Sequence, residues 1–175
     1  HTSDIIDNLG IQNGEIVADI GCGSGFFAYQ FSNMVGSKGK VYAIELKDEH
    51  LQTLETFLDK EKVTNVETIK GREDILELPE KVDKMFMCSL YHVLYGVIPD
   101  NDRDTYLKSL CKHLKPGGEL IIVDNGPVDD DTLPYHGPYI ARELIEYQLS
   151  YYGFELVDYK QIIPQRYMLT FRLKE

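Results

Sequence analysis

Residues 17–28 read VADIGCGSGFFA, and this stretch decides the fold class. An apolar run ends at Asp19, three glycines follow at alternate positions, Gly21, Gly23 and Gly25, and an apolar segment with helical spacing comes next. This order predicts a buried strand, a tight turn and the start of a helix. Glycine permits positive φ and lets a ligand approach the backbone closely. The first N–H groups of a helix lack intrahelical partners and can face a polar ligand.

The spacing of these glycines separates two kinds of nucleotide-cofactor site. Dinucleotide-binding folds carry G-x-G-x-x-G, because their helix N-terminus receives a pyrophosphate. Here the pattern is G-x-G-x-G, with Asp19 two residues before the first glycine. A carboxylate at the end of the strand repels a pyrophosphate and favours a ligand that carries positive charge. The alternative is a turn that binds nothing, although alternate glycines after an acid have little use in packing.

Composition limits the class of protein and its partners. The 175 residues, 43% hydrophobic and 27% charged, predict a single globular domain over 1–175, whose start at His1 instead of Met suggests a truncated N-terminus. The net charge of −11 disfavours nucleic acid and an anionic membrane surface as partners. Three cysteines without ligand-like spacing, and no apolar run of membrane-spanning length, predict a cytoplasmic protein.

Strand and helix patterns alternate along most of the chain. Strands are predicted at residues 16–20, 40–45, 65–70, 81–88, 119–124, 154–159 and 166–173, and helices near 2–9, 26–35, 48–58, 102–114 and 139–152. Asp48 is expected to cap the helix that it begins. The alternation predicts a parallel sheet covered by helices on both faces. The short connection between the last two strands requires one of them to run antiparallel.

Together with these elements, three later segments resemble landmarks of the class I S-adenosylmethionine (SAM)-dependent methyltransferases. They are GREDILELPEKVDKMFM at 71–87, LKPGGELIIVD at 114–124 and YYGFELVDY at 151–159. The resemblance runs from about Gly14 to Leu173. It implies an α/β three-layer sandwich with a mostly parallel seven-stranded sheet that ends in an antiparallel hairpin. It also implies SAM as cofactor and S-adenosylhomocysteine (SAH) as product.

The resemblance places the methionine portion of SAM at the glycine-rich turn. The residues concerned are Asp19, Gly21, Cys22, Gly23 and Gly25. Gly21 and Gly23 would allow close backbone approach, and Asp19 would act through its negative charge, directly or through water.

Glu45 ends the second strand, 24 residues after Gly21. A carboxylate there can accept hydrogen bonds from both hydroxyls of a ribose. The resemblance gives it this role and places Leu46 beside the adenine. The alternative is an exposed glutamate at a strand end, which is common in an acidic protein.

Glu73 and Asp74 follow the third strand. Either acid, or its backbone, could bind the adenine amino group, with Ile75 covering the ring. Two adjacent acids leave the choice open, and an acidic pair that begins a helix is an equal alternative.

The segment Cys88-Ser89-Leu90-Tyr91-His92 leaves the fourth strand, where the methyl group should meet its acceptor. In similar enzymes the backbone at Ser89 and Leu90 lines the cofactor. Tyr91 and His92 are candidates to orient or deprotonate the acceptor, although a lone histidine is more often structural. Methyltransferases that act on nucleic-acid bases usually carry Asn/Asp-Pro-Pro-Tyr here, so Ser-Leu-Tyr-His disfavours that class.

Two further segments lie near the predicted site. Asp124-Asn125 matches a pair found in metal-dependent catechol-type O-methyltransferases, but the third ligand position falls near Ser89, which is no ligand for a hard metal ion. We therefore expect no metal. The loop at 133–139, LPYHGPY, includes His136 and supplies aromatic residues for a lid over an acceptor pocket.

These features favour a SAM-dependent methyltransferase acting on a small-molecule acceptor. A protein side chain as acceptor is the second choice. A SAM-binding subunit without catalysis is an alternative of a different class, and a nicotinamide-dependent oxidoreductase is disfavoured by the glycine spacing.

Overall fold

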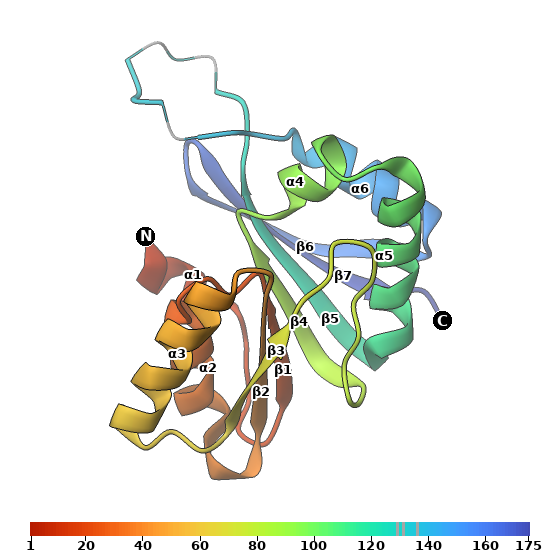
Figure 1. Cartoon of the computed structure of the whole chain (residues 1–175). Helices are drawn as coiled ribbons and strands as arrows, with labels where there is room; N and C mark the ends of the chain where they lie inside the picture. The colour runs from red at the N-terminus through yellow and green to blue at the C-terminus, as the bar shows by residue number, and fades with distance from the viewer. Residues whose placement is uncertain (129, 131, 136) are drawn as a thin grey trace.

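The computed structural model describes residues 1–128, 130, 132–135 and 137–175, and a seven-stranded sheet forms its centre (Figure 1). The strands are β1 (Ile16–Ile20), β2 (Lys40–Glu45), β3 (Val66–Lys70), β4 (Val82–Cys88), β5 (Leu114–Asn125), β6 (Phe154–Ile163) and β7 (Arg166–Leu173). Their order in the sheet is β3-β2-β1-β4-β5-β7-β6. The first five strands are parallel, and β7 runs antiparallel to both β5 and β6. The predicted sheet and its terminal hairpin are confirmed.

The strand order reverses at β1, which lies between β2 and β4. Ala18 of β1 is opposite Tyr42 on one side and Met85 on the other. Strand β1 is buried along nearly its whole length, as its apolar sequence requires for a strand covered on both faces. The helices that follow β1 and β4 pack on opposite faces of the sheet, and open α/β sheets bind their ligands at such a reversal.

Helices cover both faces of the sheet (Figure 1). They are α1 (Thr2–Asn8), α2 (Phe26–Val35), α3 (Asp48–Glu61), α4 (Tyr91–Gly96), α5 (Asp100–His113) and α6 (Arg142–Tyr151), with the 3₁₀ turn η1 (Gly36–Lys38). The apolar sides of α1, α2 and α3 join one core cluster, and those of α4, α5 and α6 join the other. The sheet therefore separates two hydrophobic layers, which makes the predicted three-layer sandwich.

Several boundaries differ from the sequence-based expectation. Strand β5 begins at Leu114, because Leu114 already pairs with Val82 before the register shifts. Helix α6 begins at Arg142 and not near residue 139, since the Ile140 amide is bound to the Asn125 carbonyl. Helix α4 was not expected. Asp48 makes no capping hydrogen bond.

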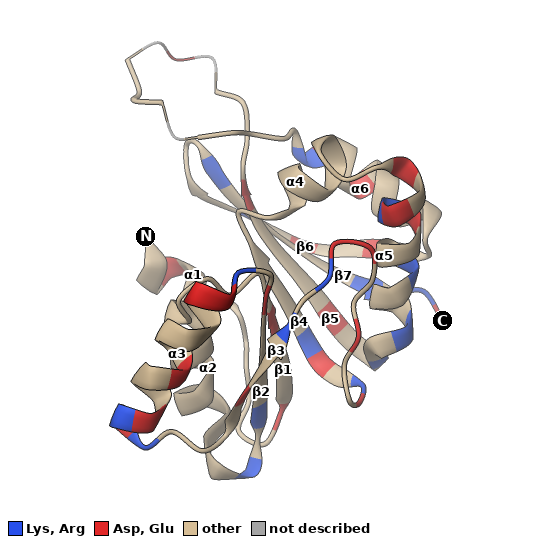
Figure 2. Cartoon of the chain, viewed as in Figure 1, with Lys and Arg blue, Asp and Glu red and all other residues tan. Residues whose placement is uncertain are grey.

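The charged residues are dispersed over the chain. Figure 2 shows acidic residues on α3, α5 and the segment after β3, with basic residues among them. No helix in the described part of the chain is both long and apolar enough to cross a bilayer. Cys22, Cys88 and Cys111 are all free thiols.

Candidate cofactor and active site

The glycine-rich turn after β1 has the backbone that its sequence predicts. Gly21, Gly23 and Gly25 have φ values of +74°, +55° and +87°. A Cβ on Gly25 would lie 2.2 Å from Leu54 Cδ1, and one on Gly21 would lie 3.1 Å from Leu90 Cδ2. At Gly23 the same position is open. All three positions thus favour glycine by their backbone conformation. Gly21 and Gly25 also lack room for a side chain, whereas Gly23 leaves space in front of the turn.

Glu45 holds this turn from the neighbouring strand. Its Oε2 accepts a hydrogen bond from the Gly23 amide at 2.9 Å, and its Oε1 accepts from the amides of Leu46 and Lys47 at 2.8 and 2.9 Å. Burial raises the pKa of this carboxyl, but the three backbone donors outweigh burial and hold the pKa below its usual value. Glu45 is therefore an ionised acceptor at the carboxyl end of β2.

Asp19 lies at the end of β1, beneath the turn, and is 2% exposed. Its Oδ2 is buried and has no hydrogen-bond partner. Burial raises the pKa of this carboxyl to about 7; a hydrogen bond from the Ala28 backbone opposes the shift and the charge of Glu45 adds to it. An unpartnered carboxylate is costly inside a protein. A cationic ligand above the turn would relieve that cost.

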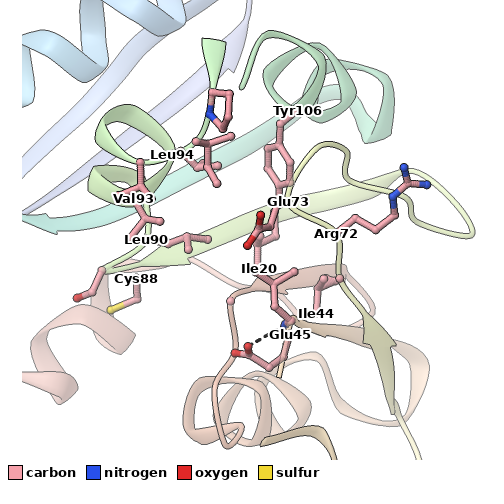
Figure 3. Close-up of a pocket in the computed structure, with 17 residues that line it drawn as sticks. Ile20, Ile44, Glu45, Arg72, Glu73, Cys88, Leu90, Val93, Leu94 and Tyr106 are labelled. Carbon is pink, nitrogen blue, oxygen red and sulfur yellow. Dashed lines mark hydrogen bonds between the residues drawn. The ribbon is translucent and has the colours of Figure 1, made fainter. Parts of the chain in front are cut away.

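A cavity of about 270 Å³ opens beyond the carboxyl ends of β1, β2 and β4. Six of the predicted cofactor residues line it: Gly21, Glu45, Leu46, Glu73, Ser89 and Leu90. Figure 3 shows Glu45 and Ile44 on one side, Leu90, Val93 and Leu94 on another, and Tyr106 and Glu73 across from them. The glycine turn, the end of β2 and the segment after β4 thus meet in one cavity with mixed polar and apolar walls.

The remaining cofactor candidates do not line this cavity. Cys22 is half-buried, and its thiol is 3.5 Å from the Gly23 carbonyl. Asp74 is bound to Arg72, with oxygen–nitrogen distances of 2.9 and 2.7 Å, and Ile75 lines a smaller neighbouring cavity. Glu73 is the member of the acidic pair that reaches the large cavity, and neither acid begins a helix.

Tyr91 and His92 point in different directions. Tyr91 is fully buried and donates a hydrogen bond from its hydroxyl to Gln148 of α6 at 2.7 Å. Burial raises the pKa of this phenol. The structure thus places Tyr91 in the core and not in the cavity, which contradicts the expectation that it meets the acceptor.

His92 instead contacts the end of β5. Its Nδ1 lies 2.9 Å from Oδ1 of Asp124, and its backbone amide donates to Asp124 Oδ2 at 3.1 Å. The Asp124 side chain is fully buried, and that of His92 is 16% exposed. A carboxylate at Nδ1 favours the tautomer that is protonated there and leaves Nε2 as the acceptor. The sequence singled out Asp124 only as a metal-ligand candidate and missed this pairing.

A second, smaller cavity of about 140 Å³ lies beside Asn125. Its wall includes Leu133, Pro134, Tyr135 and Tyr139, so the described part of the predicted lid borders a hollow. His136 of the same loop lies outside the described residues. Among the residues that the structure describes, no group of three or more His, Cys, Asp or Glu side chains is arranged to hold a metal ion.

A family model described as "Methyltransferase domain" matches residues 11–164. The chain belongs to the class I SAM-dependent methyltransferases. Its structure is similar to that of a SAM-dependent methyltransferase from Aquifex aeolicus, with a TM-score of 0.81 and 26% identity over 97% of this chain and 87% of that one. The glycopeptide N-methyltransferase MtfA shares the fold at a TM-score of 0.78 and 14% identity, covering 98% of this chain and 88% of its own.

Curated relatives in sequence include the ubiquinone/menaquinone biosynthesis C-methyltransferase UbiE of Francisella tularensis subsp. holarctica. It is 33% identical over 120 residues, which cover 68% of this methyltransferase and 46% of UbiE. The enzyme of the same name from Serratia proteamaculans is 32% identical over the same shares. The chain thus spans less than half the length of these relatives.

Proposed function

We propose that this methyltransferase transfers a methyl group from SAM to a small molecule, with a quinol ring as the first acceptor to test. The observation that carries the proposal is the cavity between the glycine turn, Glu45 and Ser89. His92 and Asp124 are not among the residues that line it, and they enter the proposal through their own hydrogen-bonded pairing beside the lining residues Leu90 and Val93. The ubiquinone/menaquinone biosynthesis C-methyltransferases among the chain's curated relatives support the quinol ring.

The residues present fit the cofactor at both of its ends. The unpartnered Oδ2 of Asp19 offers a negative charge beneath the turn, where the ammonium of the methionine portion would lie. Glu45 offers an ionised oxygen to the ribose, and Leu46 and Leu90 offer apolar contacts to the adenine. Glu73 lines the cavity, and we assign it to accept a hydrogen bond from the adenine amino group.

When bound, SAM supplies an activated methyl group and a neutral leaving group. The protein then has to align the acceptor and exclude water. For a quinol acceptor the hydroxyl proton also has to leave as the ring carbon attacks the methyl group. The proton on that ring carbon is then lost and the oxygen is reprotonated, so that one proton is released overall. We assign the hydroxyl proton to Nε2 of His92, while Asp124 keeps Nδ1 protonated and stabilises the imidazolium that forms.

The test uses the purified chain with SAM and reduced 1,4-naphthoquinone as acceptor. We expect SAH to accumulate together with a C-methylated ring product, identified by mass spectrometry. SAH binding without any methyl transfer to this quinol or to a small-molecule cell extract would favour a non-catalytic SAM-binding subunit.

A further inference from the structure

Arg166, at the start of β7, extends its guanidinium over the carboxyl ends of β4 and β5. Its Nη2 donates hydrogen bonds to Ser89 Oγ at 2.7 Å and to Cys88 Sγ at 2.9 Å. Its Nη1 donates to Asn125 Oδ1 at 3.0 Å. The residue is half-buried. One arginine thus connects the ends of three strands.

All three of these partners are neutral, which sets Arg166 apart from the other arginines. Each of those forms an ion pair with a carboxylate: Arg72 with Asp74, Arg103 with Asp100, Arg142 with Glu143 and Glu146, and Arg172 with Glu119. Arg166 has no such partner among the described residues, in a protein of net charge −11. A half-buried cation without a counterion is unfavourable. A guanidinium also has five N–H donors, of which these contacts use three.

The position of Arg166 relates it to methyl transfer. Cys88 and Ser89 line the cavity of about 270 Å³. Asn125 and the adjacent Gln165 line the cavity of about 140 Å³. The guanidinium therefore bridges lining residues of the two cavities, although Arg166 itself lines neither. Ser89 is held there in a left-handed conformation, with φ of +54°, by a hydrogen bond from its amide to the Val123 carbonyl at 2.8 Å. Strained backbone at such a place is typical of functional sites.

We propose that Arg166 binds an anionic oxygen of the methyl acceptor, a carboxylate or a phenolate, and so selects acceptors of this charge. The inference rests on the proposed function, because it takes the large cavity as the cofactor site. A guanidinium matches the planar geometry of a carboxylate and can donate two parallel hydrogen bonds to it. The carboxylate of the cofactor itself is the other source of the same chemistry, and the test separates the two.

The experiment compares two probes that differ in charge, 1-hydroxy-2-naphthoate and 1-hydroxy-2-naphthamide. Their dissociation constants are measured by ligand-observed NMR on the SAH-saturated protein. SAH affinity is measured separately by calorimetry. The variants are Arg166→Met and Arg166→Lys, with Arg172→Met as a control on the same strand, where the arginine pairs with Glu119.

We expect the wild-type protein and Arg172→Met to bind the naphthoate at least about tenfold more tightly than the naphthamide. Arg166→Met should abolish this preference, Arg166→Lys should keep part of it, and both should bind SAH within about twofold of wild type. No preference in the wild type, or the same preference in Arg166→Met, would overturn the inference. So would a loss of SAH affinity in Arg166→Met without an effect on the naphthoate, since the cation would then serve the cofactor. Failure of the wild type to bind SAH would instead refute the proposed function.

Discussion

The backbone amide of Gly23 donates a hydrogen bond to Oε2 of Glu45 at 2.9 Å, which fastens the glycine turn after β1 to the end of β2. The amides of Leu46 and Lys47 bind Oε1. A carboxylate has about four lone-pair sites, so one site on Oε2 remains for a ligand hydroxyl. Glu45 therefore shapes the turn and keeps one acceptor for the ribose.

Asp19→Asn is expected to change how stability depends on pH. The folded protein keeps a proton on Asp19 up to about pH 7, whereas the unfolded chain releases it near the ordinary pKa of 3.8. Wild-type stability should therefore fall as the pH rises through this window, by up to about 4 kcal/mol from this residue. The variant lacks this loss. Urea unfolding at pH 5 and pH 8 measures the greater part of this loss, and equal pH dependence in both proteins would contradict the burial argument.

The same variant should bind the cofactor more weakly. Loss of the ionised carboxylate should cost about 1–3 kcal/mol of SAH affinity at pH 8. The cost should shrink at pH 6, where the wild-type carboxyl is mostly protonated. Calorimetry at the two pH values provides the measurement. Unchanged affinity at pH 8 would remove Asp19 from the site.

His92→Gln should lower methyl transfer to the quinol by about 10²–10⁴-fold without changing SAH affinity, because only proton removal is lost. Asp124→Asn should also slow transfer, since an amide no longer favours the Nδ1-protonated tautomer. His113→Gln, at the C-terminal end of α5, is the control. Initial rates of SAH formation measure all three. A His92→Gln rate within about threefold of wild type would exclude His92 as the base.

Gly25→Ala should destabilise the fold by roughly 2–4 kcal/mol, from the left-handed φ and from the clash with Leu54. In a Leu54→Ala background only the conformational cost should remain, about 1–2 kcal/mol. Urea unfolding of the four proteins in this cycle gives the coupling. Strictly additive effects would show that the two residues do not compete for space.

Much of the fold was predictable because the signals are local. The apolar run before Asp19 and the glycines after it define β1 and the turn. The apolar stripe of α3 and the short link before β7 define their elements equally well. Helix α4 was missed, because Tyr91–Gly96 has only six residues and is too short to show helical periodicity.

The site was predictable only in part, because the His92–Asp124 and Arg166–Ser89 contacts join segments that are distant in the sequence. Adjacent helix residues point about 100° apart. Tyr91 therefore enters the core while His92 reaches Asp124, which is 32 positions away in the sequence. Arg166 meets Ser89 across 77 positions, through the register of β5 and β7. No local pattern encodes these pairings.

Titration of SAH into the wild-type chain and into Glu45→Ala, followed by calorimetry, tests the central claim most directly. We expect saturable one-to-one binding in the wild type. Glu45→Ala should lose about 2–4 kcal/mol of binding free energy, because the charge-assisted hydrogen bond to the ribose and the support of the turn are both lost. The control is Glu67→Ala. This variant removes a glutamate of β3 that pairs with Lys40 of β2, and it should bind SAH as the wild type does. Binding of NADH with no binding of SAH by the wild type, or less than about a threefold difference for Glu45→Ala, would contradict the claim.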